Sequence, residues 1–292
     1  MARMYNFAFI AFIRRLTSSP NRSLVQQFKF FKSLQYRPIF YFAFLGVSFS
    51  KKEDIRGIEN IKMSEIKASL EQADVLFEEN KFQETVNFLK TLDQSSAEVQ
   101  WRLARALFKL SGTESNSSEK SEIIKTAYEH VKEALEKDDN NFAIHKWYAI
   151  LLDARSNLDG IKARVTQLET VKSHMIRAIE LNPNDSTSRY ILGEFYFGLA
   201  SLSWYEKKIV STLFAKPPDA TYEEALEHFL KAEELKADFY SMNKLMMGKC
   251  YLALKNNEKA KEFLTKASEI QVQNEDDRKC KEEATKLLSK VK

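Results

Sequence analysis

Small residues recur along this chain at a spacing that limits the fold more than any other feature does. Four apolar helical stretches end in alanine, with intervals of 44, 54 and 35 residues between successive alanines: Ala134, Ala178, Ala232 and Ala267. Two further stretches share a glycine followed three positions later by tyrosine: Leu192-Gly193-x-x-Tyr196 and Met247-Gly248-x-x-Tyr251. Small residues at regular positions let helix backbones approach closely, with the tyrosines filling the hollow beside them. The pattern predicts helix hairpins stacked side by side.

The intervals indicate a tetratricopeptide-type repeat, whose unit is about 34 residues long. The interval of 35 residues is regular, and the intervals of 44 and 54 imply inserts of roughly 10 and 20 residues. We expect one insert to lengthen a hairpin between Leu152 and Met175, and the other to lie between Tyr196 and Ala225. The sequence therefore predicts an all-α, tetratricopeptide-like helical-hairpin solenoid with inserted segments.

The unit that ends at Ala134 starts at Trp101 and is interrupted by 111–118, a segment rich in serine that we predict to be a loop. A weaker unit, from about 66 to 92, precedes it. Seven glycines and five prolines in 292 residues suit such long helices and suit sheets poorly.

Helix ends can also be predicted. Pro183 stops one helix after Ala178, and Thr221-x-x-Glu224 has the pattern of a capping box. The last helix, 276–290, carries a thin apolar stripe and is predicted to cap the solenoid. We expect Cys250 to be buried and Cys280, in this highly charged helix, to be exposed; two cysteines are too few for a disulfide framework.

Charge divides the chain in two. Residues 1–52 hold nine Lys/Arg and no acidic residue, so the remainder has 36 bases against 41 acids, out of totals of 45 and 41. We predict a basic N-terminal targeting segment, 1–52, and a helical repeat domain, 53–292. The mildly acidic repeat domain excludes general nucleic-acid binding.

The N-terminal segment suits a mitochondrial presequence, because it is rich in arginine and aromatic residues and free of acids. Its apolar run, 39–49, is shorter than the roughly 20 residues that a membrane-spanning helix needs. A shallow membrane anchor built from this run is the second interpretation, and a secretory signal is the third. Whether the segment is cleaved stays open.

Motifs for catalysis, metals or cofactors are not found. The four histidines, His130, His145, His174 and His228, do not share the spacing that places two ligands on one helix face. There is no glycine-rich phosphate loop and no nucleophile elbow. We interpret His145 as a core or capping histidine, and we predict no enzyme activity, no metal and no cofactor.

The second insert is the candidate for specific binding. Between 201 and 216 it places aromatic residues at helical spacing beside lysines, namely Trp204, Lys207, Lys208, Phe214 and Lys216. The segment can contact an acidic partner or lipid headgroups, or its apolar face can simply pack across the stack. We favour packing, with the lysines in solvent. Trp147 and Tyr148 complete the candidate partner-binding residues.

Several strings resemble the regulator of microtubule dynamics family from about residue 65 to the C-terminus. They include 101–106, 145–150, 160–163, 178–183, Trp204-Tyr205 and Leu213-Phe214-Ala215-x-Pro217-Pro218-x-x-Thr221-Tyr222-Glu223. The similarity is greatest to the short form with a mitochondrial-type N-terminus. It implies a tetratricopeptide-like fold, association with microtubules and spindle poles, and, for some members of the family, mitochondrial residence. A longer relative tethers the outer mitochondrial membrane to endoplasmic reticulum and carries phospholipid, but this chain lacks its long linker.

Three functions follow as hypotheses. The first is a microtubule-associated interaction scaffold, which needs a local basic patch because tubulin tails are acidic. The second is a lipid-binding or membrane-contact module with an apolar hollow lined by Trp147, Tyr148, Trp204 and Phe214. The third is a peptide-binding scaffold with a polar concave groove. The oligomeric state stays open.

Overall fold

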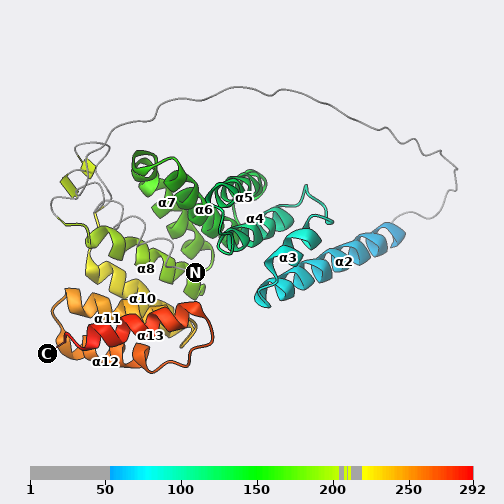
Figure 1. Ribbon diagram of the computed structural model, residues 1–292. Helices are drawn as coiled ribbons and strands as arrows, with labels where there is room; N and C mark the ends of the chain where they lie inside the picture. The colour runs from blue at the N-terminus through cyan, green and yellow to red at the C-terminus, as the bar shows by residue number, and fades with distance from the viewer. Residues whose placement is uncertain (1–52, 204–206, 209, 212–218, 292) are drawn as a thin grey trace.

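The computed structural model describes residues 53–203, 207–208, 210–211 and 219–291, with side chains from 64 onward except that of residue 161. All regular elements in this part of the chain are α-helices (Figure 1). They are α2 (Glu53–Glu78), α3 (Phe82–Leu89), α4 (Ala97–Ser111), α5 (Ser117–Lys137), α6 (Phe142–Leu158), α7 (Ile161–Leu181), α8 (Ser186–Ala200), α10 (Tyr222–Leu235), α11 (Ser241–Ala253), α12 (Asn257–Ser268) and α13 (Glu275–Leu288).

Short polar side chains start most of these helices. At the N-terminus of a helix the first backbone N–H groups lack partners, and a side-chain oxygen can accept their hydrogen bonds. Thr221 and Glu224 form the predicted capping box at the start of α10, in which each side chain binds the other residue's backbone N–H. The side chains that cap other helices in this way are Asn116, Asn141, Asp185, Asn256 and Asn274.

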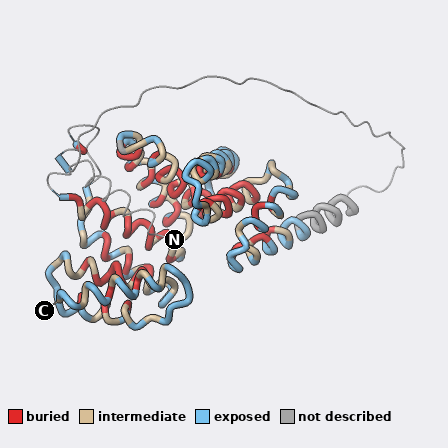
Figure 2. Tube along the Cα trace, in the orientation of Figure 1, coloured by how far each residue is buried: buried red, intermediate tan, exposed pale blue. Residues whose placement is uncertain are grey.

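The helices pair as hairpins, α2 with α3, α4 with α5, α6 with α7, α8 with α10 and α11 with α12, and α13 follows as a single helix. Figure 1 shows the hairpins in chain order from α2 at one end to α13 at the other. Buried residues are concentrated in the middle of this stack, whereas α5 and α12 expose one side to solvent (Figure 2). The predicted solenoid is confirmed.

Glycines sit where the hairpin helices pack most closely. A Cβ atom added to Gly193 on α8 would lie 2.8 Å from the ring of Phe229 on α10, and one added to Gly248 on α11 would lie 2.7 Å from Leu264 on α12. Both distances are too short for any larger residue without displacement of the partner. The four repeat alanines, Ala134, Ala178, Ala232 and Ala267, are all fully buried. The small residues therefore set the helix separation, as the repeat predicts.

The inserts agree with the sequence in two places and differ in one. α6 and α7 form a long hairpin, so the insert between Leu152 and Met175 extends both helices. The second insert lies between α8 and α10, and part of it is outside the described residues. The predicted loop at 111–118 was too long. α4 continues through Ser111, and α5 begins at Ser117, because Asn116 caps it.

α13 covers the last hairpin, and its buried face corrects one expectation. Ala284 is fully buried, and Leu287, Leu288 and Val291 pack against the core. Cys250 is buried as expected, but the prediction that Cys280 is exposed was wrong. It is fully buried, and its thiol donates to the backbone oxygen of Ser241 at 3.3 Å. The charges of α13 lie on its other faces.

None of the helices in the described ranges has the length and hydrophobicity needed to cross a bilayer.

Candidate partner-binding groove

A large groove runs along the inner face of the stack, and we call it the concave groove. Its volume is about 1030 Å³. Residues of α4, α6 and α8 line it, together with residues of α2 and α3, of the segment between α10 and α11, and of α13, so the stack curves around it. Curved repeat proteins typically bind their partners on such a concave surface. Its lining includes Glu78, Phe108, Lys109, Thr113, Trp147, Thr187, Tyr190, Lys236, Phe239, Tyr240, Glu275, Asp276 and Lys279.

Aromatic rings form two groups in the groove. The ring of Trp147 meets Phe108 edge-on, with centroids 6.0 Å apart. Tyr190 lies edge-on to Tyr240, 5.1 Å away, and to Phe239, 6.2 Å away. Phe108, Trp147 and Tyr190 are almost fully buried, so the partly exposed rings of Phe239 and Tyr240 are the ones that can contact a partner. Aromatic rings are enriched at the centre of protein interfaces.

Charged side chains also line the groove. The groove is lined by three lysines, Lys109, Lys236 and Lys279, and by three carboxylates, Glu78, Glu275 and Asp276. Lys279 binds Glu275 at 3.0 Å, and the hydroxyl of Tyr240 donates to Asp276 at 3.0 Å. Burial lowers the pKa of Lys109, although nearby Asp276 and Glu78 oppose the shift. The lining is thus mixed in character and carries equal numbers of both charges.

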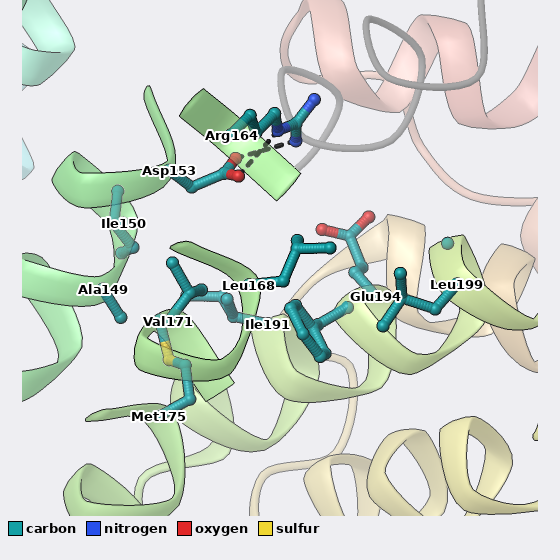
Figure 3. A pocket seen from close by; sticks show the side chains of 12 residues that line it. Ala149, Ile150, Asp153, Arg164, Leu168, Val171, Met175, Ile191, Glu194 and Leu199 are labelled. Carbon is teal, nitrogen blue, oxygen red and sulfur yellow. Dashed lines mark hydrogen bonds and ion pairs between the residues drawn. The ribbon is translucent and has the colours of Figure 1, made fainter. Parts of the chain in front are cut away.

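A second, much smaller pocket lies among α6, α7 and α8 (Figure 3). Leu168, Val171, Met175 and Ile191 form its apolar part, and its volume is about 50 Å³. That is room for water-sized molecules, whereas sites for larger ligands span roughly 300–1,000 Å³. The pocket as it stands does not hold a lipid.

Charged groups occupy one side of this small pocket. Arg164 on α7 binds Asp153 on α6 through two hydrogen bonds, Nε to Oδ1 at 2.7 Å and Nη2 to Oδ2 at 2.8 Å, and both residues are buried. Figure 3 shows the carboxyl group of Glu194 on the same side of the pocket. The hydroxyl of Tyr190 donates to Glu194 at 2.8 Å. Burial raises the pKa of Glu194 to about 8, so this group keeps its proton at pH 7.

Glu194 gives the protein a pH-dependent stability. The unfolded chain releases this proton near the ordinary pKa of 4.5, whereas the folded chain holds it until about 8. The folded state therefore binds more protons between these values, and stability falls as pH rises through them, by at most about 1.4 kcal/mol per pH unit. We expect Glu194→Gln to remove this loss and to be more stable than wild type at pH 8. Urea denaturation at pH 5, 6, 7 and 8 measures it.

The control is Glu136→Gln, which makes the same exchange at an exposed position on α5 and should follow the wild-type profile. If Glu194→Gln retained the wild-type decline between pH 5 and 8, Glu194 would not be its source.

Of the predicted partner-binding residues, the structure describes Trp147, Tyr148, Lys207 and Lys208. Trp147 is buried with its ring in the concave groove, whereas Tyr148 packs on the ring of His174 at 4.5 Å, away from the groove. Lys207 and Lys208 are exposed. Trp204, Phe214 and Lys216 lie outside the described residues. In the same insert Val210 is buried against Val165, Leu168, Leu199 and Leu202, so this part of the insert packs on the stack. A binding role for the candidate residues stays a prediction.

Two histidines form a contact that their spacing in the sequence did not suggest. His145 on α6 and His174 on α7 approach with their Nδ1 atoms 2.8 Å apart. The Nε2 of His145 lies 2.8 Å from the carbonyl of Asp139 and must donate to it, so its Nδ1 accepts from His174. His145 is therefore a buried histidine that binds the turn before α6, as we interpreted it. Burial lowers the pKa of His174 to about 4, so this ring is neutral at pH 7.

Nothing in the described part of the chain gathers three or more His, Cys, Asp or Glu side chains that could hold a metal ion. The geometry instead defines a class of protein, a tetratricopeptide-like helical repeat protein with a concave groove. A crystal structure of a thermophilic TPR protein from Thermus thermophilus shares the fold, with a TM-score of 0.54 and 15% sequence identity over 75% of this chain and 98% of that chain.

Within this class the chain belongs to the regulator of microtubule dynamics protein 1-3 family, whose model matches residues 69–292. Regulator of microtubule dynamics protein 1 from Bos taurus is 42% identical over 78% of this chain and 72% of its own length. The Mus musculus protein 1 is 39% identical, over 77% and 75%. Regulator of microtubule dynamics protein 3 from Rattus norvegicus is 34% identical over 77% of this chain, which spans about half of that relative (48%).

Proposed function

We propose that this chain is a non-enzymatic scaffold that associates with microtubules and holds a protein partner in its concave groove. The groove carries the proposal. It is of ligand-binding size, aromatic rings line it, and its charges are balanced rather than uniformly basic. These properties suit a peptide segment with apolar and charged side chains. The family name supports the link to microtubules.

Electrostatic attraction to acidic tubulin tails must then come from elsewhere on the chain. Two sources are the insert lysines, Lys207, Lys208 and Lys216, and the nine basic residues of 1–52. Attraction between exposed charges is screened by salt, with a Debye length of about 8 Å at physiological ionic strength. Binding in the groove depends on shape and burial and is less sensitive to salt. The two contributions can therefore be separated.

The acid-free, arginine-rich composition of 1–52 supports a further proposal, that the protein is targeted to mitochondria and has additional microtubule and spindle-pole pools. The lipid alternative has less support. That alternative needs one apolar hollow lined by four aromatic residues, but two of them, Trp147 and Tyr148, face different sides of α6. The small pocket beside α6 has a volume of only about 50 Å³. Protease protection of the C-terminus in intact mitochondria would separate an internal pool from one that reaches cytosolic microtubules.

Co-sedimentation of the full chain with microtubules tests the scaffold proposal. The groove variant combines Thr113→Arg with Thr187→Arg, two positions that line the concave groove outside the buried core. The control combines Thr126→Arg with Thr285→Arg, at exposed positions of α5 and α13 that do not line it. Both variants gain the same charge. We expect the groove variant to bind about tenfold more weakly than the control, which corresponds to about 1.4 kcal/mol.

The salt dependence supplies the second readout. We expect Lys207→Glu, Lys208→Glu and Lys216→Glu together to weaken binding at low salt and to flatten its salt dependence. Equal binding by the groove variant and its control would remove the groove from the proposal. A wild-type chain that stays in the supernatant at every salt concentration would remove microtubule association itself.

A further inference from the structure

A third hollow lies on the other side of α8 from the concave groove, and we call it the outer pocket. It is bounded by the end of α7, by α8 and by α10, and its volume is about 400 Å³. α8 turns Tyr190 and Ile191 toward the concave groove and Arg189, Leu192 and Tyr196 toward the outer pocket. The two hollows are thus separate. The volume is near the lower limit of ligand pockets and suits a small group rather than a long segment.

Two polar side chains of this pocket, Arg189 and His228, carry a buried nitrogen without a partner among the described residues. No hydrogen bond or ion pair joins the side chain of Arg189 to another residue that the structure describes, and its Nε is buried. The Nδ1 of His228 is likewise buried without a partner among those residues. A buried polar atom without a hydrogen-bond partner destabilises a protein. Two such atoms that line one pocket indicate that a ligand supplies the missing partner, which is an acceptor for Arg189 and, in the tautomer with the proton on Nδ1, for His228 as well.

The position of these groups determines the charge of that ligand. The ring of His228 stacks on Tyr196, with centroids 5.5 Å apart and planes at 4°. Burial, and then the charge of Arg189, lower the pKa of His228, so the ring is neutral at pH 7, although Glu224 and Glu227 oppose the shift. Arg189 is then the cation that lines the pocket, and the guanidinium fork matches a carboxylate in geometry.

Other charges around the pocket favour a ligand with one negative charge. Glu180 lines the rim, and its carboxylate binds Arg177 at 3.2 Å. Lys172 lies over the ring of Tyr196, 5.5 Å from its centroid. A carboxylate at the rim repels a doubly charged phosphate more than a singly charged carboxylate.

The rest of the wall is apolar. Leu192 and Ile179 are buried, and Ile176 is 37% exposed, so an apolar side chain is open to a ligand at this wall. The ligand must therefore carry an apolar group close to its carboxylate. The last residue of a protein chain has both on its Cα atom, whereas the carboxylate of an internal Asp or Glu ends its own side chain and any apolar side chain belongs to another residue. Capture of a C-terminal carboxylate is a recurrent mode of peptide recognition.

We propose that the outer pocket binds the C-terminal residue of a partner protein, with the carboxylate at Arg189 and His228 and an apolar last side chain against Ile176, Ile179 and Leu192. The guanidinium donates to the carboxylate as a fork, and a small rotation of the His228 ring adds a third hydrogen bond from Nδ1. This site shares no lining residue with the concave groove, and the proposal does not rest on microtubule binding.

The test uses the full chain with ¹³C-labelled isoleucine methyl groups. The probe is an acetylated five-residue glycine–serine peptide that ends in leucine, with either a free C-terminal carboxylate or a C-terminal amide. We expect the carboxylate peptide to shift the methyl signals of Ile176 and Ile179, assigned with Ile176→Val and Ile179→Val. The amide peptide should bind at least about tenfold more weakly, because it lacks the charge that the guanidinium recognises.

Variants and competing ligands complete the test. Arg189→Gln should abolish the shifts, and Arg155→Gln, which removes an arginine paired with Asp159 at the opposite end of the α6–α7 hairpin, should not change them. Circular dichroism of both variants establishes that they are folded. Equal binding of the two peptides, or no shift with either at millimolar concentration, would contradict the proposal. So would binding of inorganic phosphate or octanoate without the carboxylate peptide, which would assign the pocket to a phosphate or to a fatty carboxylate.

Discussion

Asp153→Ala is expected to lower the free energy of unfolding by about 3–5 kcal/mol. The side chains of Asp153 and Arg164 are only 9% and 7% exposed, and their two hydrogen bonds join α6 to α7. Removal of the carboxylate leaves a buried guanidinium without the charge that compensated its loss of hydration. Urea denaturation followed by far-UV circular dichroism measures the change.

Two controls show whether the buried charge causes the loss. Asp159→Ala breaks the exposed ion pair with Arg155 on the same helix hairpin and should cost less than about 1 kcal/mol. The double variant Asp153→Leu with Arg164→Met should be more stable than Asp153→Ala, since apolar side chains of similar size replace a buried ion pair at little cost. A double variant less stable than Asp153→Ala would refute this explanation.

Phe229→Ala is expected to cost about 3–5 kcal/mol as well. The ring of Phe229 is fully buried, lies against Gly193 of α8 and contacts the ring of Tyr190 at 5.6 Å. Its removal leaves a cavity at the point where α8 and α10 approach most closely, and helices held by their neighbours collapse into such a cavity only in part. Thermal and urea unfolding give the loss.

Phe263→Ala is the matched control for this cavity. Phe263 on α12 is half-buried and stacks on Tyr251 at 5.5 Å, so its removal should cost clearly less. The double variant Gly193→Ala with Phe229→Ala gives a second check. The added methyl group occupies part of the cavity, so the double variant should be no less stable than Phe229→Ala. If Gly193→Ala lowered the free energy of unfolding equally with and without the Phe229 ring, that ring would not contact position 193.

The features that the sequence revealed are those that depend on neighbours within one hairpin. Gly193 and Gly248 mark close helix contacts, and Thr221 with Glu224 marks a helix start, because in each case the residues that interact lie in one repeat unit. The insert between Leu152 and Met175 could be placed from the interval alone. Polar contacts between helices could not be placed, because they depend on how far each helix is rotated about its axis.

Asp153, His145 and Arg189 illustrate this limit. Asp153 follows an apolar run, 149–152, and this position on a buried face was a signal that it needs a partner. Nothing in the sequence identified Arg164 as that partner. His174 and His228 were likewise separated from their contacts by about one repeat. Cys280 was assigned to the surface because its helix is rich in charge, although only one face of a capping helix needs to be apolar. The groove and the outer pocket follow from curvature, which the repeat pattern does not specify.

α8 forms a wall of both the concave groove and the outer pocket, with Tyr190 on one side and Arg189 next to it on the other. A molecule that tilts or rotates this helix from one side must alter the surface offered on the other. If a ligand in one hollow changes the affinity of the other hollow by some factor, a ligand in the second hollow must change the affinity of the first by the same factor. Two ligands bound in these two hollows would then affect each other's affinity through one turn of α8, without direct contact between them.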